Sequence, residues 1–389
     1  MLRSDIIVGM KIREVRAFGL RGRTPEGGWS NELRPDDCVH TIVAVLTDEG
    51  PVGWGSVFTS EDLVRASLAV LRPLYEGESA IEPERVSEKL HQNTFWQGRG
   101  GAITHTISGI DLALWDLFGK TCGQPVGRLL GGRYRERVRP YASLLMREPE
   151  QMSDELLPVK QQGMRAFKIG WGPFGKQSTK VDEAIVRAAR DVVGPDSMLM
   201  VDAGASDAFW PRDFKWAVRT AEMLADYDVA WFEEPLVPDA LEDFVALRRV
   251  SRVPIAGGEV LTRRQSFRPW LEAGAFDIVQ PDVTKVGGLS EERRIAWMAR
   301  EHGVRFIPHG WNTAIGLASD LQIASAFPET DLVEYLTGSL FIDDLLTNKW
   351  KLDADGMLPI PDCPGLGVDI DLDALAEFTG RPDVRDLLR

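Results

Sequence analysis

The chain has 389 residues, a formal net charge of −14 and three cysteines. A surface this acidic repels phosphate backbones and anionic lipid, which argues against nucleic acid or a membrane as a partner. The cysteines are odd in number and lack a C-x-x-C pair, and no stretch approaches the roughly 20 apolar residues of a membrane helix, so we expect a cytoplasmic protein without disulfides. A chain of this length predicts one large unit and a smaller one.

Residues 10–55 alternate apolar and polar residues in the manner of strands. KIREVRAFGL is followed by a Gly/Pro-rich break and then by CVHTIVAVLTDEGPVGWG, which predicts a hairpin. Apolar residues at three- and four-residue intervals then predict helices at 61–74, 82–93 and 102–120. We therefore expect a small α+β domain over residues 1–135, completed by a short strand pair and a terminal helix within residues 350–389.

From Val138 the pattern changes to short apolar or β-branched runs that alternate with amphipathic stretches. The eight runs are VRPYAS, RAFKIG, SMLMVDAG, VAWFEEP, PIAGGEV, FDIVQPD, VRFIPHG and DLVEYL. Eightfold alternation predicts a parallel (β/α)₈-type barrel, which we place at residues 136–349. A doubly wound open sheet shows the same alternation, so the positions of the polar residues have to separate the two folds.

Every predicted barrel strand after the first ends in an ionisable residue. These residues are Lys168, Asp202, Glu233 with Glu234, Glu259, Asp282, His309 and Glu334. A charge at the end of a buried strand is costly unless it is paired or ligated, and the carboxyl ends of barrel strands converge at one mouth. The pattern therefore favours a barrel with a chemical site at its mouth over seven separate structural caps.

Three of these carboxylates, Asp202, Glu233 and Glu259, follow consecutive strands. Like charges that lie so close together cannot all stay ionised without a cation. Hard oxygen ligands suit Mg²⁺, with Mn²⁺ as an alternative, whereas Zn²⁺ would recruit more histidine or cysteine. Glu234 competes with Glu233 for the ligand position, because alternation along a strand sends only one of two neighbours inward.

Two further groups fall on opposite sides of the predicted mouth. Lys168 on the second strand and His309 on the seventh could serve the two faces of one carbon atom, and Asp282 is placed to accept the imidazole N–H and raise its basicity. Glu334 on the eighth strand is a candidate acid or hydrogen-bond donor to an oxygen that gains charge. Lys285, three residues beyond Asp282, could approach the site, but a surface ion pair is the expected role.

Several motifs occur in order along the chain: RAFKIG, VDAGAS, WFEEP, GGEV, QPDVTKVGG, IPHGW and VEYL, with GIDLALWDLFGK before them and PGLGV after them. Together they resemble the mandelate racemase subgroup of the enolase superfamily over essentially the whole chain. The resemblance implies an α/β fold in which an α+β capping domain covers a (β/α)₇β TIM-like barrel. It also implies a small carboxylate substrate and favours a homo-oligomer.

The resemblance assigns roles to the residues at the mouth. It implies that the three carboxylates hold octahedral Mg²⁺ and that Glu233, not Glu234, is the ligand from the fourth strand. His309 and Asp282 would act as a dyad, and Glu334 would take the position that hydrogen-bonds the substrate carboxylate. The chemistry that follows is removal of a proton α to a carboxylate.

Trp29 lies in the Gly/Pro-rich break. In the resembling enzymes this loop closes over the substrate, so Trp29 is a candidate substrate contact. Two positions depart from those enzymes. The first lysine of their K-x-K motif is replaced by Ala166, which leaves Lys168 as base, acid or electrostatic clamp, and Gly204 stands where many of them place Asn.

The preferred function is Mg²⁺-dependent removal of the proton α to a carboxylate by a hydro-lyase that dehydrates an aldonic or aldaric acid to a 2-keto-3-deoxy acid. A racemase or epimerase and a cycloisomerase would pass through the same enediolate, so the sequence leaves them open. A barrel that binds a ligand without turnover is disfavoured because the three carboxylates and the dyad are all intact.

Overall fold

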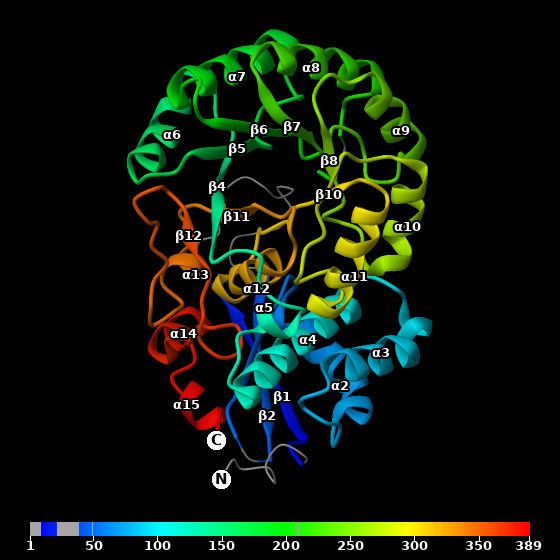
Figure 1. The fold of residues 1–389 in the computed structure, drawn as a ribbon, viewed down its shortest axis with the longest axis vertical. Helices are drawn as coiled ribbons and strands as arrows, with labels where there is room; N and C mark the ends of the chain where they lie inside the picture. The colour runs from blue at the N-terminus through cyan, green and yellow to red at the C-terminus, as the bar shows by residue number, and fades with distance from the viewer. Residues whose placement is uncertain (1–8, 22–38, 49, 208–209) are drawn as a thin grey trace.

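The computed structural model describes residues 9–21, 39–48, 50–207 and 210–389 of the chain. Trp29 lies outside the described residues. Within them the chain folds into a small α+β domain and a large barrel that lie against each other (Figure 1). No helix in this part of the chain combines the length and the apolar character needed to span a bilayer.

The small domain is built on an antiparallel sheet, as its sequence predicts. Its strands, which pair in this order, are β1 (Ile12–Leu20), β2 (His40–Thr47) and β3 (Gly53–Val57). They are followed by α2 (Glu61–Tyr75), α3 (Pro83–Thr94), the 3-10 turn η1 (Phe95–Gln97), α4 (Gly101–Cys122) and α5 (Val126–Leu129). Helix α4 crosses β3 so closely that a Cβ at Gly55 would lie 1.9 Å from the Gly109 carbonyl oxygen, so only glycine fits at position 55.

The large domain alternates strands and helices. Its strands are β4 (Arg137–Leu145), β5 (Ala166–Gly170), β6 (Met198–Asp202), β7 (Val229–Glu233), β8 (Ile255–Gly257), β9 (Ile278–Val279), β10 (Arg305–Phe306) and β11 (Leu332–Leu336). The 3-10 turn η2 (Pro149–Gln151) and seven helices separate them: α6 (Met152–Gln161), α7 (Thr179–Val193), α8 (Phe214–Asp226), α9 (Leu241–Val250), α10 (Arg263–Ala273), α11 (Gly288–Glu301) and α12 (Ala314–Ala326).

The eight strands form one parallel sheet. They pair in chain order from β4 to β10, and β11 pairs with β4. Across the remaining gap between β10 and β11, the Thr330 hydroxyl donates to the Phe306 carbonyl oxygen at 3.0 Å. The predicted (β/α)₇β barrel is thus confirmed, and the alternative of a doubly wound open sheet is wrong.

A layer of side chains fills the barrel interior, and each strand, or the residue next to it, contributes one of them. This buried layer consists of Tyr141, Ala166, Met200, Trp231, Ala256, Ile278, Ile307 and Leu332. The rings of Tyr141 and Trp231 meet edge to face with centroids 5.4 Å apart, and the small Ala166 belongs to the same layer. Since Trp231 precedes Glu233 by two residues on one strand, both point to the interior, and the layer forms the floor of the mouth.

Helices α4 and α11 join the two domains. The Asp111 carboxylate on α4 accepts from the Ser290 backbone N–H at 3.0 Å and from the Ser290 hydroxyl at 2.5 Å. The Trp115 indole N–H donates to the same hydroxyl at 3.0 Å. All three side chains are buried, so this polar contact fixes the position of the small domain on the barrel.

The C-terminal stretch contacts both domains. Its elements are α13 (Leu340–Asp343), β12 (Leu358–Pro359), α14 (Leu372–Thr379) and α15 (Val384–Leu387). Helix α14 lies beside β1 as expected, and the Arg21 backbone N–H donates to the Phe378 carbonyl oxygen at 2.7 Å (Figure 1). The expected strand pair on the small domain is wrong, because β12 pairs instead with β4 of the barrel.

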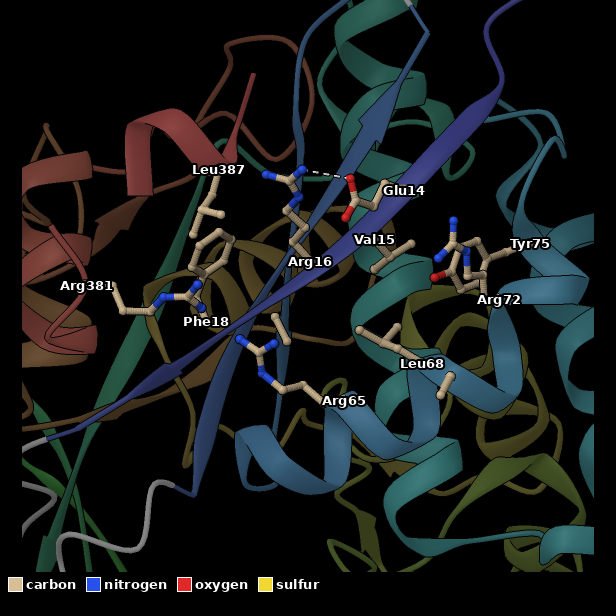
Figure 2. Close-up of a pocket in the computed structure, with 12 residues that line it drawn as sticks. Glu14, Val15, Arg16, Phe18, Arg65, Leu68, Arg72, Tyr75, Arg381 and Leu387 are labelled. Carbon is tan, nitrogen blue, oxygen red and sulfur yellow. Dashed lines mark hydrogen bonds and ion pairs between the residues drawn. The ribbon is translucent and has the colours of Figure 1, made fainter. Parts of the chain in front are cut away.

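A pocket of about 390 Å³ opens on the small domain between β1, α2 and the C-terminal residues (Figure 2). Four arginines line it, and each has a carboxylate neighbour: Arg16 with Glu14, Arg65 with Glu61, Arg72 with Glu76 and Arg381 with Glu61. Their positive charge is therefore offset locally, and none of the predicted site residues lines this pocket.

Candidate active site

The three carboxylates predicted to hold a metal meet at the carboxyl ends of neighbouring strands. Asp202 and Glu233 end β6 and β7, and Glu259 follows β8 by two residues. One oxygen of each lies within 4.8 Å of the others, and all three residues are buried. Burial and the charge of Glu233 raise the pKa of Asp202 well above its usual value.

This cluster fits a hard divalent cation. Its donors are carboxylate oxygens. When the described residues are searched for histidine, cysteine and acidic side chains close enough together to hold a metal ion, these three residues form the group that is found. Three buried carboxylates at this spacing repel one another unless a cation or protons offset the charge. Oxygen donors suit Mg²⁺ better than a metal that prefers nitrogen or sulfur.

Glu233 is held in place from the floor of the mouth. Its Oε2 accepts from the Trp231 indole N–H at 2.9 Å and from the Gln280 amide at 2.8 Å, while its Oε1 lies 2.6 Å from the Lys168 ammonium. Neither Trp231 nor Gln280 was predicted from the sequence as a site residue. A sequence pattern could have identified them, because side chains two positions apart on a strand point to the same face, and each of these residues precedes a predicted site residue by two positions.

Glu234 has a different environment from its neighbour. Its backbone takes a left-handed φ of 41°, and its side chain is buried outside the group of three carboxylates. Burial and the nearby charge of Glu259 raise the pKa of Glu234 to about 8. The structure thus brings Glu233, and not Glu234, into the cluster.

Lys168 lies within β5 on one side of the cluster. Its Nζ is 2.6 Å from Glu233 Oε1, 2.9 Å from Glu334 Oε1 and 3.7 Å from Asp202 Oδ2. Burial works against the ammonium, but the surrounding carboxylates outweigh it and raise the pKa of Lys168 well above its usual value. The carboxylates thus favour the ammonium form of Lys168, and a cation bound to the same carboxylates would oppose this effect.

His309 lies on the other side. Its Nδ1 is 2.8 Å from Asp282 Oδ2, and its Nε2 is 2.9 Å from Glu259 Oε2. The second oxygen of Asp282 accepts from the Thr284 backbone N–H at 2.7 Å and from the Thr284 hydroxyl at 2.6 Å. The predicted neighbours His309 and Asp282 are therefore in contact, and Thr284 fixes the orientation of the carboxylate.

Glu334 lies between these two nitrogen groups. Its Oε2 accepts from the Gly310 backbone N–H at 2.8 Å and from the Tyr141 hydroxyl at 3.2 Å, and it is 4.0 Å from His309 Nε2. Burial opposes ionisation, but the charges of Lys168 and His309 lower the pKa of Glu334 below its usual value. Glu334 is thus held as an acceptor at the centre of the mouth.

The prediction that Lys285 forms a surface ion pair is wrong. Its side chain is only 8% exposed, and its Nζ lies 3.5 Å from Asp282 Oδ2 and 3.8 Å from Glu259 Oε1. The ammonium also sits 4.4 Å from the centroid of the Phe58 ring, which comes from the small domain. The turn after Asp282 directs the Lys285 side chain back into the mouth. This direction could not be predicted from the sequence, because Lys285 lies beyond the end of the predicted strand.

The structure accounts for the two departures from the resembling enzymes. Ala166 lies in the apolar floor beneath Lys168, among large aromatic side chains. At Gly204, with φ of 62°, a Cβ would come within 2.6 Å of the Trp171 indole. Trp171 itself has a left-handed φ of 60°, so its ring occupies the space that a side chain at position 204 would need.

Comparison with protein families agrees with this geometry. Residues 37–131 match the model of the mandelate racemase / muconate lactonizing enzyme N-terminal domain. Residues 151–374 match the enolase C-terminal domain-like model. The two matches fall on the small domain and on the barrel with part of the C-terminal stretch.

Individual relatives cover nearly the whole chain. D-galactarolactone cycloisomerase of Agrobacterium fabrum is 34% identical over 95% of this chain and 99% of its own length. D-xylonate dehydratase of Haloferax volcanii is 31% identical over 86% of this chain and 84% of its own. The crystal structure of 3,6-anhydro-D-galactonate cycloisomerase from Zobellia galactanivorans superimposes with a TM-score of 0.84 at 30% identity, covering 95% of this chain and 99% of that one. The chain therefore belongs to the mandelate racemase subgroup of the enolase superfamily.

Proposed function

We propose that the protein uses Mg²⁺ to remove the proton α to the carboxylate of an aldonic or aldaric acid and then eliminates the 3-hydroxyl group, which gives a 2-keto-3-deoxy acid. The observation that carries this proposal is the cluster of three buried carboxylates with Lys168 on one side and the His309–Asp282 pair on the other. Relatives named as dehydratases of xylonate and arabinonate support the same class of substrate.

Asp202, Glu233 and Glu259 would hold the metal. When bound, Mg²⁺ supplies positive charge where the substrate carboxylate gains negative charge as its α proton leaves. Trp231 and Gln280 keep one oxygen of Glu233 occupied, so its other oxygen faces Lys168 and the cluster. The ligand set is therefore oriented by the floor before any substrate enters.

His309 or Lys168 would take the proton, depending on the configuration at C2. The C2–H bond breaks, its electron pair forms the C2–C3 double bond of an enol, and the C3–O bond breaks with release of water. Asp282 holds the imidazole through Nδ1, which leaves Nε2 toward the cluster. The nitrogen group that does not act as base is placed to protonate the leaving oxygen, and tautomerisation then gives the keto acid.

A cycloisomerase is the second candidate. Similarity to cycloisomerases named for D-galactarolactone and 3,6-anhydro-D-galactonate favours it. Such a reaction would remove the same proton, but an oxygen within the substrate ring would leave instead of a hydroxyl. Epimerisation would instead return a proton to the opposite face of C2, and nitrogen groups on two sides of the mouth permit that outcome.

A screen of acid sugars and their lactones with Mg²⁺ tests the proposal. The expected result is 2-keto-3-deoxy acid from an open-chain acid, lost in His309→Asn or Lys168→Met. Product from a lactone or anhydro sugar alone would establish the cycloisomerase instead. Retained turnover in both variants would contradict the assignment of the two nitrogen groups.

Other expectations belong with this proposal. Trp29 would contact the substrate, so Trp29→Ala should raise KM more than it lowers kcat.

Residues 1–135 with 350–389 would form the capping domain and residues 136–349 the barrel. A homo-oligomer in the cytoplasm is expected, and light scattering on the purified protein measures the subunit number.

A further inference from the structure

Lys285 is a buried cation in the mouth for which the proposed reaction has no use. It lies in the turn after Asp282, and its side chain is 8% exposed. Its ammonium is close to two carboxylates, Asp282 at 3.5 Å and Glu259 at 3.8 Å. A buried ammonium is costly unless its surroundings offset its charge, so its position between two acids needs an explanation.

The same two carboxylates contact the two ring nitrogens of His309. Asp282 Oδ2 lies 2.8 Å from Nδ1, and Glu259 Oε2 lies 2.9 Å from Nε2. The four side chains therefore form a closed ring in which two nitrogen groups alternate with two carboxylates. When the imidazole is neutral, as it must be to accept a proton, the charge of Lys285 still offsets the repulsion between the two acids.

The capping domain also contacts the ammonium. Phe58 follows β3, and its ring centroid is 4.4 Å from Lys285 Nζ, a distance typical of a cation–π contact. The Phe58 carbonyl oxygen lies 2.9 Å from His105 Nδ1 on α4, which ties the phenylalanine to its own domain. Lys285 thus lies where the capping domain meets the proposed proton-transfer site.

We infer that Lys285 is a positioning residue that holds Asp282 and Glu259 at the spacing that orients the His309 imidazole, and that Phe58 makes this orientation depend on the docked capping domain. The inference rests on the proposed role of His309 in proton transfer. Lys285 contacts one of the three cluster carboxylates, Glu259, and its loss removes no proposed metal ligand. If Lys285 had a structural role alone, its substitution would lower both the stability of the fold and the affinity for Mg²⁺.

The test compares the full-length variants Lys285→Met and Lys285→Arg, with Phe58→Leu as a probe of the capping contact. In Lys285→Met, kcat should fall by about 10- to 100-fold, the range for loss of an outer-shell partner, while the Kd for Mg²⁺ does not increase because a positive charge near Glu259 is gone. Lys285→Arg should restore most of kcat. Phe58→Leu should give an intermediate kcat.

A spectroscopic measurement separates this inference from the proposed function. In protein labelled with ¹⁵N-histidine, the Nδ1 proton of His309 should give a downfield resonance, assigned by its absence in His309→Asn. The resonance should persist in Lys285→Arg and shift or broaden in Lys285→Met, without any substrate. This result would support the inference even if no acid sugar were turned over, in which case the proposed function alone would fail.

Two results would overturn the inference. An unchanged resonance together with wild-type kcat in Lys285→Met would show that the imidazole is oriented without the lysine. A parallel loss of thermal stability and Mg²⁺ affinity, with no rescue by arginine, would make Lys285 a structural residue.

Discussion

Glu233 and Glu234 are adjacent acids whose environments differ. Glu233 is fixed by Trp231, Gln280 and Lys168 within the carboxylate cluster, whereas Glu234 turns away through its left-handed backbone. Period two along β7 predicts that only one of them faces the cluster, but not which one. The resemblance to a known family chose Glu233, and the structure places that residue among the three carboxylates.

This difference predicts unequal effects of two isosteric substitutions. Glu233→Gln should weaken Mg²⁺ binding by more than about 100-fold, beyond the range for outer-shell residues, because it removes a ligand charge. Glu234→Gln should change the Kd for Mg²⁺ by less than about 10-fold. Calorimetric titration with Mg²⁺ measures both, and the Mg²⁺-dependent rise in Tm should vanish only in Glu233→Gln. Equal losses in the two variants would assign a ligand role to both acids.

The contact between Gly204 and Trp171 makes a second prediction. Gly204→Ala should lower the free energy of unfolding by about 2 to 4 kcal/mol, because its Cβ meets the indole and its φ of 62° suits glycine. The matched double variant with Trp171→Ala should lose less than the sum of the single effects, since the clash is gone and only the backbone strain remains. Urea unfolding gives the three values, and strictly additive losses would refute the steric explanation.

At the scale of elements, the eight barrel strands were predictable because each is a short apolar run that ends in a polar residue. The same pattern placed seven ionisable groups at one mouth, where Lys168, His309 and the acids now meet. The surface ion pair was the wrong choice for Lys285 because its approach to the site depends on the turn that follows Asp282, and the direction of a side chain in a turn does not follow from a repeating pattern. The two-residue strand β12 was misplaced for a related reason: its pairing with β4 is set by contacts far apart in the sequence.

The junction of α4 and α11 predicts a pH effect on stability. Burial outweighs the hydrogen bonds from Ser290 and raises the pKa of Asp111 to about 8. The folded state therefore keeps a proton that the unfolded chain releases above about pH 4, so the stability contributed by Asp111 is present in acid and lost as the pH rises toward 8.

Asp111→Asn should remove this dependence. The amide has the shape of the protonated carboxyl and can keep the contacts to Ser290, so the variant should gain stability relative to the wild type as the pH increases from 5 to 8, by up to about 1.4 kcal/mol per pH unit. Denaturant unfolding at several pH values measures the difference. A constant difference across this range would mean that Asp111 is ionised in the folded protein.

For the whole molecule, the strong negative charge and the positive groups in the mouth belong together. A net charge of −14 disfavours anionic ligands in general, while Lys168, Lys285 and the cation that Asp202, Glu233 and Glu259 would hold bring positive charge to the mouth. The barrel supplies these groups, and Phe58 of the small domain closes over one of them. Membership in the mandelate racemase subgroup fits this division between a barrel and a domain that covers its mouth.

Turnover in D₂O of the best substrate from the acid-sugar screen, followed by NMR, tests the central claim most directly. Removal of the C2 proton before loss of water predicts a 2-keto-3-deoxy acid with one deuterium at C3, and a primary isotope effect when C2 of the substrate carries deuterium. A cycloisomerase or epimerase would also lose the C2 hydrogen, so the claim of α-proton removal would stand. A product that retains the original hydrogen at C2 would contradict it.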